Sequence, residues 1–162
     1  MNKETVPQDF TLSLAIFDSL PVIFFTGSMI IIGFLFKSKL FLLGALLCLL
    51  AGLSKVIWKM IVVLKRKNIW FLFVQMRTTM PIGFLLMIVS LIVNRKTIVF
   101  SEIFSAITSF PSAVFFALGI IGMIMMLAFG FTLDGSKKSS NWIEQVTNCI
   151  AQLCFFIGLL MM

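Results

Sequence analysis

Histidine and tyrosine are absent from this 162-residue sequence, and aspartate and glutamate together number only six. Without histidine, zinc and haem lose their usual ligand, and the commonest general acid and base at neutral pH is missing. The sequence also lacks the H-E-x-x-H motif, a Walker loop, a G-x-S-x-G nucleophile elbow and the dinucleotide-binding glycine fingerprint. We therefore predict no metal and no cofactor, and no motif signals an enzyme.

Cysteine is scarce as well, with three residues that all lie inside apolar segments. None of them forms a C-x-x-C pair, so neither a redox motif nor a disulfide framework is indicated. We interpret Cys48, Cys149 and Cys154 as small packing residues.

Apolar residues make up 60% of the chain. The remaining polar side chains are too few to cover the surface of a water-soluble globule. We therefore predict that the chain is surrounded by lipid. A membrane-spanning helix needs about 20 predominantly apolar residues. Five such stretches are separated by short charged loops, at residues 12–36, 40–64, 69–93, 107–133 and 141–162. The predicted fold is an all-α, polytopic membrane helix bundle, with residues 1–162 forming a single integral membrane domain.

Local signals refine these segments. Residues 97–106 are expected to form an interfacial or re-entrant piece, because Glu102 interrupts their apolar character. The spacing of Asn141 and Glu144 is typical of a capping box, which predicts a helix start at Asn141. Prolines break the helical hydrogen-bond pattern, so we expect hinges or kinks at Pro21, Pro81 and Pro111.

Basic residues indicate how the chain is oriented. The net charge is +7, and lysines and arginines between apolar spans meet anionic headgroups and favour the cytoplasmic side. Alternating the loops puts six basic residues on the side of the N-terminus and four on the other: Lys3, Lys65, Arg66, Lys67, Lys137 and Lys138 against Lys37, Lys39, Arg95 and Lys96. We predict a cell-membrane protein with a cytoplasmic N-terminus and an external C-terminus, with membrane lipids as partners and no nucleic acid.

Ionisable residues inside the spans are the first candidates for function, because each costs at least about 2.5 kcal/mol at mid-bilayer. Alternation of the spans brings all five to the leaflet on the side of the N-terminus: Asp18, Lys55, Lys59, Arg77 and Glu144. Asp18 could carry a proton, but the ion-pair interpretation is favoured, because three cations share its leaflet.

Arg77 is the deepest of these residues and lies in the segment Gln75 to Pro81. Pro81 cannot donate a hydrogen bond to the carbonyl of Arg77, so a free carbonyl and a fixed cation coincide on one turn. Two interpretations remain open. Arg77 either forms a functional cation site or is neutralised by Asp18 or Glu144 for structural reasons.

The second span carries a stripe of small residues and lysines: Gly44, Cys48, Gly52, Lys55 and Lys59. Small residues mark close approaches between helices, so the stripe predicts inward-facing lysines and a surface for oligomerisation. We expect Lys59, adjacent to Trp58, to reach the headgroup region through its flexible stem instead.

In the fifth span Gln145, Asn148 and Gln152 form a polar stripe that should face the bundle interior, either as a ligand site or as interhelical hydrogen bonds.

The leading hypothesis is a small carrier, channel or binding protein with a polar cavity in the cytoplasmic leaflet for an anionic solute or lipid headgroup. Its predicted ligand-binding residues are Asp18, Lys55, Gln75, Arg77, Glu144, Gln145 and Asn148. The first alternative is a non-catalytic membrane subunit or assembly factor, with a homo-oligomer or another membrane protein as partner. The second is a membrane-embedded lipid-modifying enzyme, which would need two neighbouring carboxylates.

Overall fold

The structure of the chain is a computed structural model that describes residues 11–96, 98–134 and 137–162. All regular secondary structure within these ranges is helical: α1 (Leu12–Phe17), α2 (Ser19–Leu35), α3 (Lys39–Lys65), α4 (Trp70–Val93), α5 (Phe100–Thr108), α6 (Ser112–Thr132) and α7 (Lys138–Leu160). Five helices are long and apolar enough to cross a membrane, with α1 and α2 together forming the first. The predicted all-α class and the five apolar segments are confirmed.

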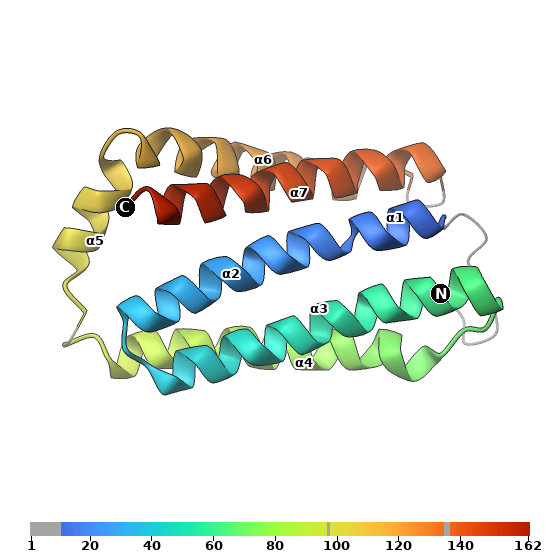
Figure 1. Cartoon of the computed structure of the whole chain (residues 1–162), viewed down its shortest axis with the longest axis horizontal. Coiled ribbons are helices and arrows are strands. Elements are labelled where there is room, and N and C mark those ends of the chain that lie inside the picture. Colours follow the sequence, from blue (N-terminus) through green and yellow to red (C-terminus); the bar gives the residue numbers. More distant parts are fainter. Residues whose placement is uncertain (1–10, 97, 135–136) are drawn as a thin grey trace.

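The long helices form two hairpins on either side of a central segment. Helix α3 packs against α4, α6 packs against α7, and α2 packs against both α3 and α7. Figure 1 shows α1 and α2 between the two hairpins, with α4 and α6 both behind the front layer. The helices alternate in direction, so α1, α4 and α7 begin at the same end, where α3 and α6 finish. We call this end of the bundle the N-terminal end.

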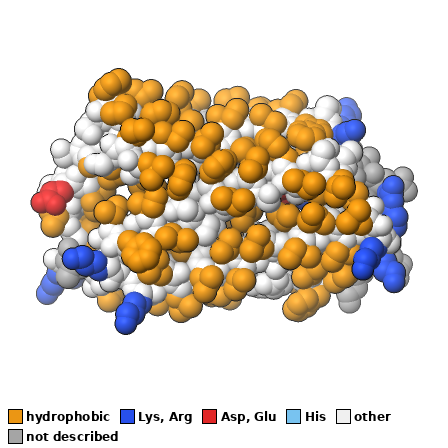
Figure 2. Space-filling view, in the orientation of Figure 1, with side chains coloured by type: hydrophobic (Ala, Val, Ile, Leu, Met, Phe, Trp, Pro, Cys, Tyr) orange, Lys and Arg blue, Asp and Glu red, His pale blue; other side chains and the backbone are white. Residues whose placement is uncertain are grey.

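Large apolar side chains cover the outside of the bundle. Phe71, Phe104 and Phe131 keep 72%, 69% and 85% of their surface exposed. In Figure 2 apolar side chains extend across the middle of the visible face, and lysines and arginines gather at its two ends. This distribution suits a bundle whose middle is surrounded by lipid and whose ends meet headgroups and water.

Small residues bring α3 and α4 into close contact. A Cβ atom added at Gly44 would lie 2.6 Å from the carbonyl oxygen of Gly83, and one at Gly83 would lie 2.7 Å from the sulfur of Cys48. Gly52 similarly accommodates Val22 of α2, where a Cβ would lie 2.8 Å from a Val22 methyl group. The small-residue stripe expected to support oligomerisation is therefore occupied by helices of the same chain.

A buried hydroxyl pair joins the same two helices at the end opposite the N-terminal end. The Ser38 and Ser90 hydroxyl oxygens lie 2.6 Å apart, and the Asn94 amide donates to the Ser90 carbonyl at 2.8 Å. The Ser38 hydroxyl also caps α3 by accepting from the Phe41 amide at 3.3 Å. This cluster satisfies polar groups where α3 begins and α4 ends.

Two predicted boundaries change. Helix α7 begins at Lys138 and not at Asn141, so the expected capping box is wrong: Asn141 lies inside the helix, where its amide donates to the Lys137 carbonyl. The described part of the predicted segment 97–106 largely corresponds to the separate helix α5, which extends to Thr108, and Thr97 lies outside the described residues.

The prolines occupy three different settings. Pro111 is the residue before α6, at the break between α5 and α6. Pro81 lies inside α4, and the helix continues through it. Pro21 is the third residue of α2, just after the interruption at Asp18.

Candidate functional site

The site begins at the interruption between α1 and α2. Pro21 has no amide hydrogen to donate to the Phe17 carbonyl, which favours a break in the helix immediately after Phe17. Asp18 occupies the break, with only 3% of the residue exposed. The chain thus places a carboxylate inside the bundle at a point where the backbone is not regularly helical.

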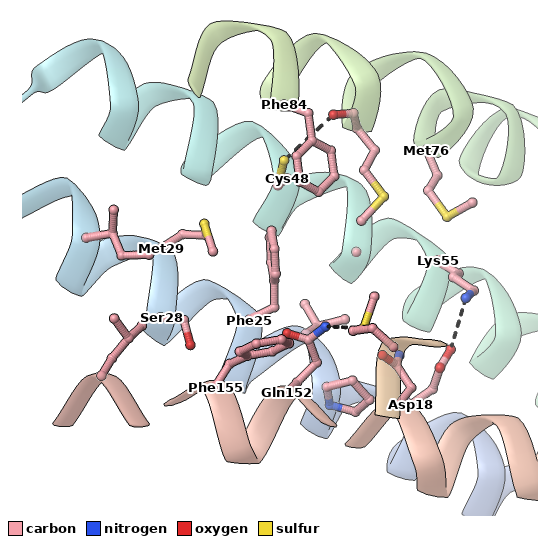
Figure 3. Close-up of a pocket in the computed structure, with 18 of the residues that line it drawn as sticks. Asp18, Phe25, Ser28, Met29, Cys48, Lys55, Met76, Phe84, Gln152 and Phe155 are labelled. Carbon is pink, nitrogen blue, oxygen red and sulfur yellow. Dashed lines mark hydrogen bonds and ion pairs between the residues drawn. The ribbon is translucent and has the colours of Figure 1, made fainter. Parts of the chain in front are cut away.

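A cavity of about 620 Å³ lies beside Asp18 along α2. Its walls come from α2, α3, α4, α6 and α7, so both hairpins contribute. Figure 3 shows Asp18 and Lys55 at one end of the cavity, with Phe25, Met29 and Phe84 farther along it. The lining residues are Asp18, Pro21, Val22, Phe25, Ser28, Met29, Ile32, Cys48, Gly52, Lys55, Met76, Met80, Phe84, Phe116, Met123, Asn148, Gln152, Phe155 and Leu159.

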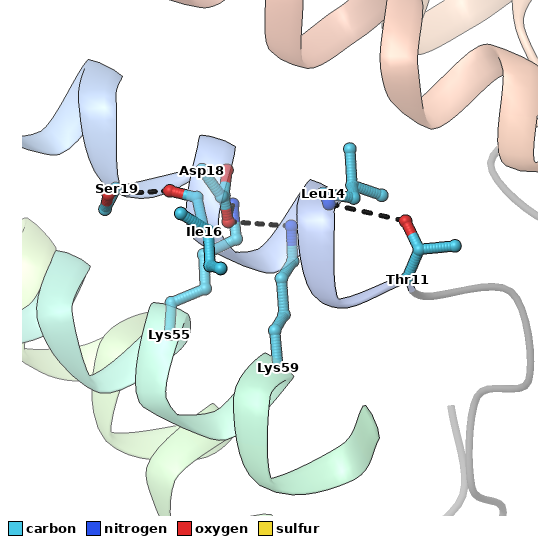
Figure 4. A network of polar contacts seen from close by, with 7 residues as sticks. All are labelled: Thr11, Leu14, Ile16, Asp18, Ser19, Lys55 and Lys59. Atoms are coloured by element: carbon cyan, nitrogen blue, oxygen red, sulfur yellow. Dashed lines mark hydrogen bonds and ion pairs between the residues drawn. The ribbon is translucent and has the colours of Figure 1, made fainter. Parts of the chain in front are cut away.

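Two lysines of α3 contact the Asp18 carboxylate. The Lys59 nitrogen lies 2.7 Å from its Oδ2 atom, and the Lys55 nitrogen lies 4.0 Å from the same oxygen (Figure 4). The side chains of Asp18 and Lys59 are 4% and 6% exposed, whereas that of Lys55 is 35% exposed. Asp18 and Lys59 therefore form a closed, buried ion pair, and Lys55 lies at its border with the cavity.

The prediction for Lys59 is wrong. It does not extend to the headgroup region but points inward with the rest of the α3 stripe, because Asp18 provides a partner at hydrogen-bonding distance. Loss of either charged group would destabilise the protein, because the opposite charge would remain buried.

Arg77 lies outside the cavity. Arg77 is exposed, and its guanidinium carbon lies 4.8 Å from the centre of the Phe73 ring, one turn earlier on α4. The expected neutralisation by Asp18 does not occur, since Asp18 pairs with lysines. Gln75 is also not among the lining residues, and its backbone carbonyl accepts a hydrogen bond from the Thr78 hydroxyl at 3.0 Å.

The polar stripe of α7 is divided between the cavity and its surroundings. Asn148 and Gln152 line the cavity, and the Gln152 amide lies 3.6 Å from the sulfur of Met123. Gln145 is buried, and its carbonyl oxygen has no hydrogen-bond partner among the described residues. Glu144 is half-buried and lies close enough to Lys59 to attract it electrostatically.

Of the seven predicted site residues, Asp18, Lys55 and Asn148 thus meet at the cavity. Sequence reasoning missed the apolar part of the lining and assigned Lys59 to the wrong environment. The helical period of α4 carried a usable signal: Met76, Met80, Gly83 and Met87 recur at spacings of three and four and face inward. Arg77 does not belong to that series, which indicates that it lies off the buried face.

The described residues contain no group of three or more histidine, cysteine or acidic side chains that could hold a metal ion. Comparison of the chain with protein-family models, curated protein sequences and solved structures finds no match. The arguments for function therefore depend on the geometry of the cavity.

Proposed function

We propose that the chain is a multi-pass integral membrane protein, a small carrier, channel or binding protein that accepts an anionic solute or lipid headgroup at the polar end of its cavity. The environment of Lys55 supports this most directly. Its side chain lines the cavity and is 35% exposed, while Lys59 holds the nearest carboxylate at 2.7 Å. Lys55 therefore retains ammonium hydrogens for an external anion.

The surroundings of Lys55 favour such binding. Most of the remaining lining is apolar, so an anion there would interact with the ammonium group through a medium of lower effective dielectric constant than water. Asn148 and Gln152 add neutral amide groups to the lining, and amide hydrogens can donate to phosphate or carboxylate oxygens.

A ligand-stabilisation assay tests the proposal. Purified protein in nanodiscs of zwitterionic phosphatidylcholine is heated with a series of phosphates, carboxylates and anionic lipids. A ligand present at 100 times its Kd should raise the free energy of unfolding by about 2.7 kcal/mol. Lys55→Gln should abolish this stabilisation, whereas Lys65→Gln, at the exposed end of the same helix, should preserve it. Absence of stabilisation by every anion, or an unchanged response of Lys55→Gln, would contradict the proposal.

The membrane topology is part of the same proposal. The five apolar helices and the apolar exterior support it, and the six-to-four basic residue count favours a cytoplasmic N-terminus in the cell membrane. Single cysteines are introduced at Arg66, Lys138 and Lys96 in a chain without native cysteines and treated with an impermeant maleimide. Arg66→Cys and Lys138→Cys should react from the cytoplasmic side and Lys96→Cys from the other. Reaction of the first two from opposite sides would contradict the topology.

Arg77 favours the alternative of a membrane subunit. Its exposed guanidinium lies on the outer side of α4, seven residues after the helix begins, where it could meet the carboxylate of a partner helix. Arg77→Ala should then abolish co-purification of a stoichiometric partner without changing anion binding. The lipid-modifying enzyme has less support, because Asp18 is the single carboxylate among the described lining residues.

A further inference from the structure

The cavity is polar at one end and apolar along the rest of its length. Asp18, the residue before α2, and Ile32 of α2 both line it and are fourteen residues apart, which corresponds to about 21 Å at the rise of a helix. Beyond Asp18 and Lys55, the α2 part of the lining is mainly apolar, from Pro21 through Phe25 to Ile32. An anion held at Lys55 would therefore fill only one end of the cavity.

The apolar part has the size and walls that suit a hydrocarbon chain. On α2 it runs from Pro21 to Ile32, about 16 Å at the rise of a helix, which is similar to the roughly 15 Å half-thickness of the bilayer core. The volume of the whole cavity, about 620 Å³, is typical of pockets that bind small molecules. Four methionines line the cavity, Met29, Met76, Met80 and Met123. Methionine side chains adapt to irregular apolar shapes, so such a wall can follow a flexible chain.

The side of the cavity between α4 and α6 bears on how a ligand could enter it. Met80 on α4 and Met123 on α6 line it from opposite hairpins. Helices α4 and α6 are not among the pairs that pack extensively in the described chain. In Figure 1 both lie in the layer behind α2, α3 and α7. A lipid-borne molecule could thus enter between them without first passing through water.

We propose that the ligand is a membrane amphiphile with an anionic head and a hydrocarbon chain, which enters between α4 and α6. Its head lies at Lys55 and its chain follows α2 toward Ile32. This inference rests on the proposed anion site. It adds that the protein recognises the hydrocarbon chain of the ligand together with its anionic head. A free phosphate or carboxylate shares the head chemistry but lacks the second contact.

The test uses two methionines of α6 that differ in their position relative to the cavity. Met123 lines it, whereas Met125 does not, and the two are similarly exposed, at 42% and 44%. Met123→Trp should narrow the apolar part, and Met125→Trp is the matched control. Binding of dodecyl phosphate and of inorganic phosphate is measured in phosphatidylcholine nanodiscs. Because all variants occupy the same bilayer, partitioning of the alkyl chain into lipid cancels from the comparison.

Met123→Trp should weaken binding of dodecyl phosphate roughly tenfold more than it weakens binding of inorganic phosphate. Met125→Trp should change neither, and Lys55→Gln should weaken both. An unchanged affinity of Met123→Trp for dodecyl phosphate, or inorganic phosphate that binds as tightly as dodecyl phosphate, would overturn the inference and leave the anion site intact. Failure of both probes to bind, or full binding by Lys55→Gln, would instead overturn the proposed function itself.

Discussion

Replacing Asp18 alone should destabilise the protein more than replacing Asp18 and Lys59 together. Asp18→Leu leaves the Lys59 ammonium group buried and without the carboxylate that lies 2.7 Å away. At that separation and an effective dielectric constant of about 20, the Coulomb attraction is roughly 6 kcal/mol, most of which offsets the cost of removing both charges from water. Removing one partner of such a pair typically costs about 3 to 5 kcal/mol.

Lys59→Met should cost less than Asp18→Leu. The reason is that Asp18 would keep Lys55, whose nitrogen is 4.0 Å from the same oxygen and whose side chain is partly exposed. Asp18→Leu combined with Lys59→Met removes both charges and replaces them with apolar side chains of similar size. The double variant should therefore return to within about 1 kcal/mol of the unmodified protein.

The free energy of unfolding is measured by SDS titration in mixed micelles, followed by the fluorescence of the three tryptophans. Lys65→Met, at the exposed end of α3, serves as the control and should change stability by less than about 0.5 kcal/mol. A double variant whose loss equals the sum of the two single losses would refute the buried pair. A loss below about 1 kcal/mol for Asp18→Leu would refute it too.

Four further substitutions test packing and polar contacts through the same unfolding measurement. Gly44→Ala should destabilise by about 1 to 3 kcal/mol, because the new methyl group would meet the α4 backbone. Gly130→Ala should be neutral or stabilising by up to about 1 kcal/mol, since nothing lies within 4 Å of its added Cβ. Equal losses of stability in Gly44→Ala and Gly130→Ala would contradict the close packing at Gly44. Thr26→Val should be neutral or slightly stabilising, because the buried Thr26 hydroxyl has no partner among the described residues, and a clear loss would indicate a bridging water. Ser90→Ala should cost about 1 to 3 kcal/mol by leaving Ser38 with fewer partners, so an unchanged stability would count against that cluster.

Much of the fold was predictable because segment length and hydropathy alone indicate helices that can cross a bilayer. Alternating helix direction also placed Asp18, Lys55 and Lys59 in the same half of the bundle, since this depends on helix order and on position along each helix. These residues come together beside α2 and α3. The position of a charged residue along the long axis of the bundle can therefore be inferred from sequence.

The rotation of each helix about its axis was harder to infer. Arg77 and Met76 are adjacent in sequence, yet Met76 lines the cavity and Arg77 is exposed. A deep arginine near a proline suggested a site, although the small and apolar residues of α4 placed the inner face elsewhere. Which of the three cations, Lys55, Lys59 or Arg77, pairs with Asp18 depends on the rotation of each helix. The sequence therefore left the partner of Asp18 open.

The sequence predicted a polar cavity but not its apolar part, because that part arises where two hairpins meet the same central helix without filling the space between them. Phe116 on α6 and Phe84 on α4 lie on opposite hairpins. No local pattern relates such residues, since their proximity depends on the packing of α2 against both α3 and α7.

Protection of a cysteine inside the cavity tests the central claim most directly, namely that an anionic amphiphile occupies it. Asn148→Cys is introduced into a chain whose three native cysteines are alanine, which leaves Asp18 and Lys55 in place. Lys138→Cys, at the exposed start of the same helix, serves as the control. A small anionic thiosulfonate should modify position 148, and dodecyl phosphate should slow that reaction without affecting position 138. A cysteine at 148 that reacts equally fast with and without dodecyl phosphate would contradict the claim.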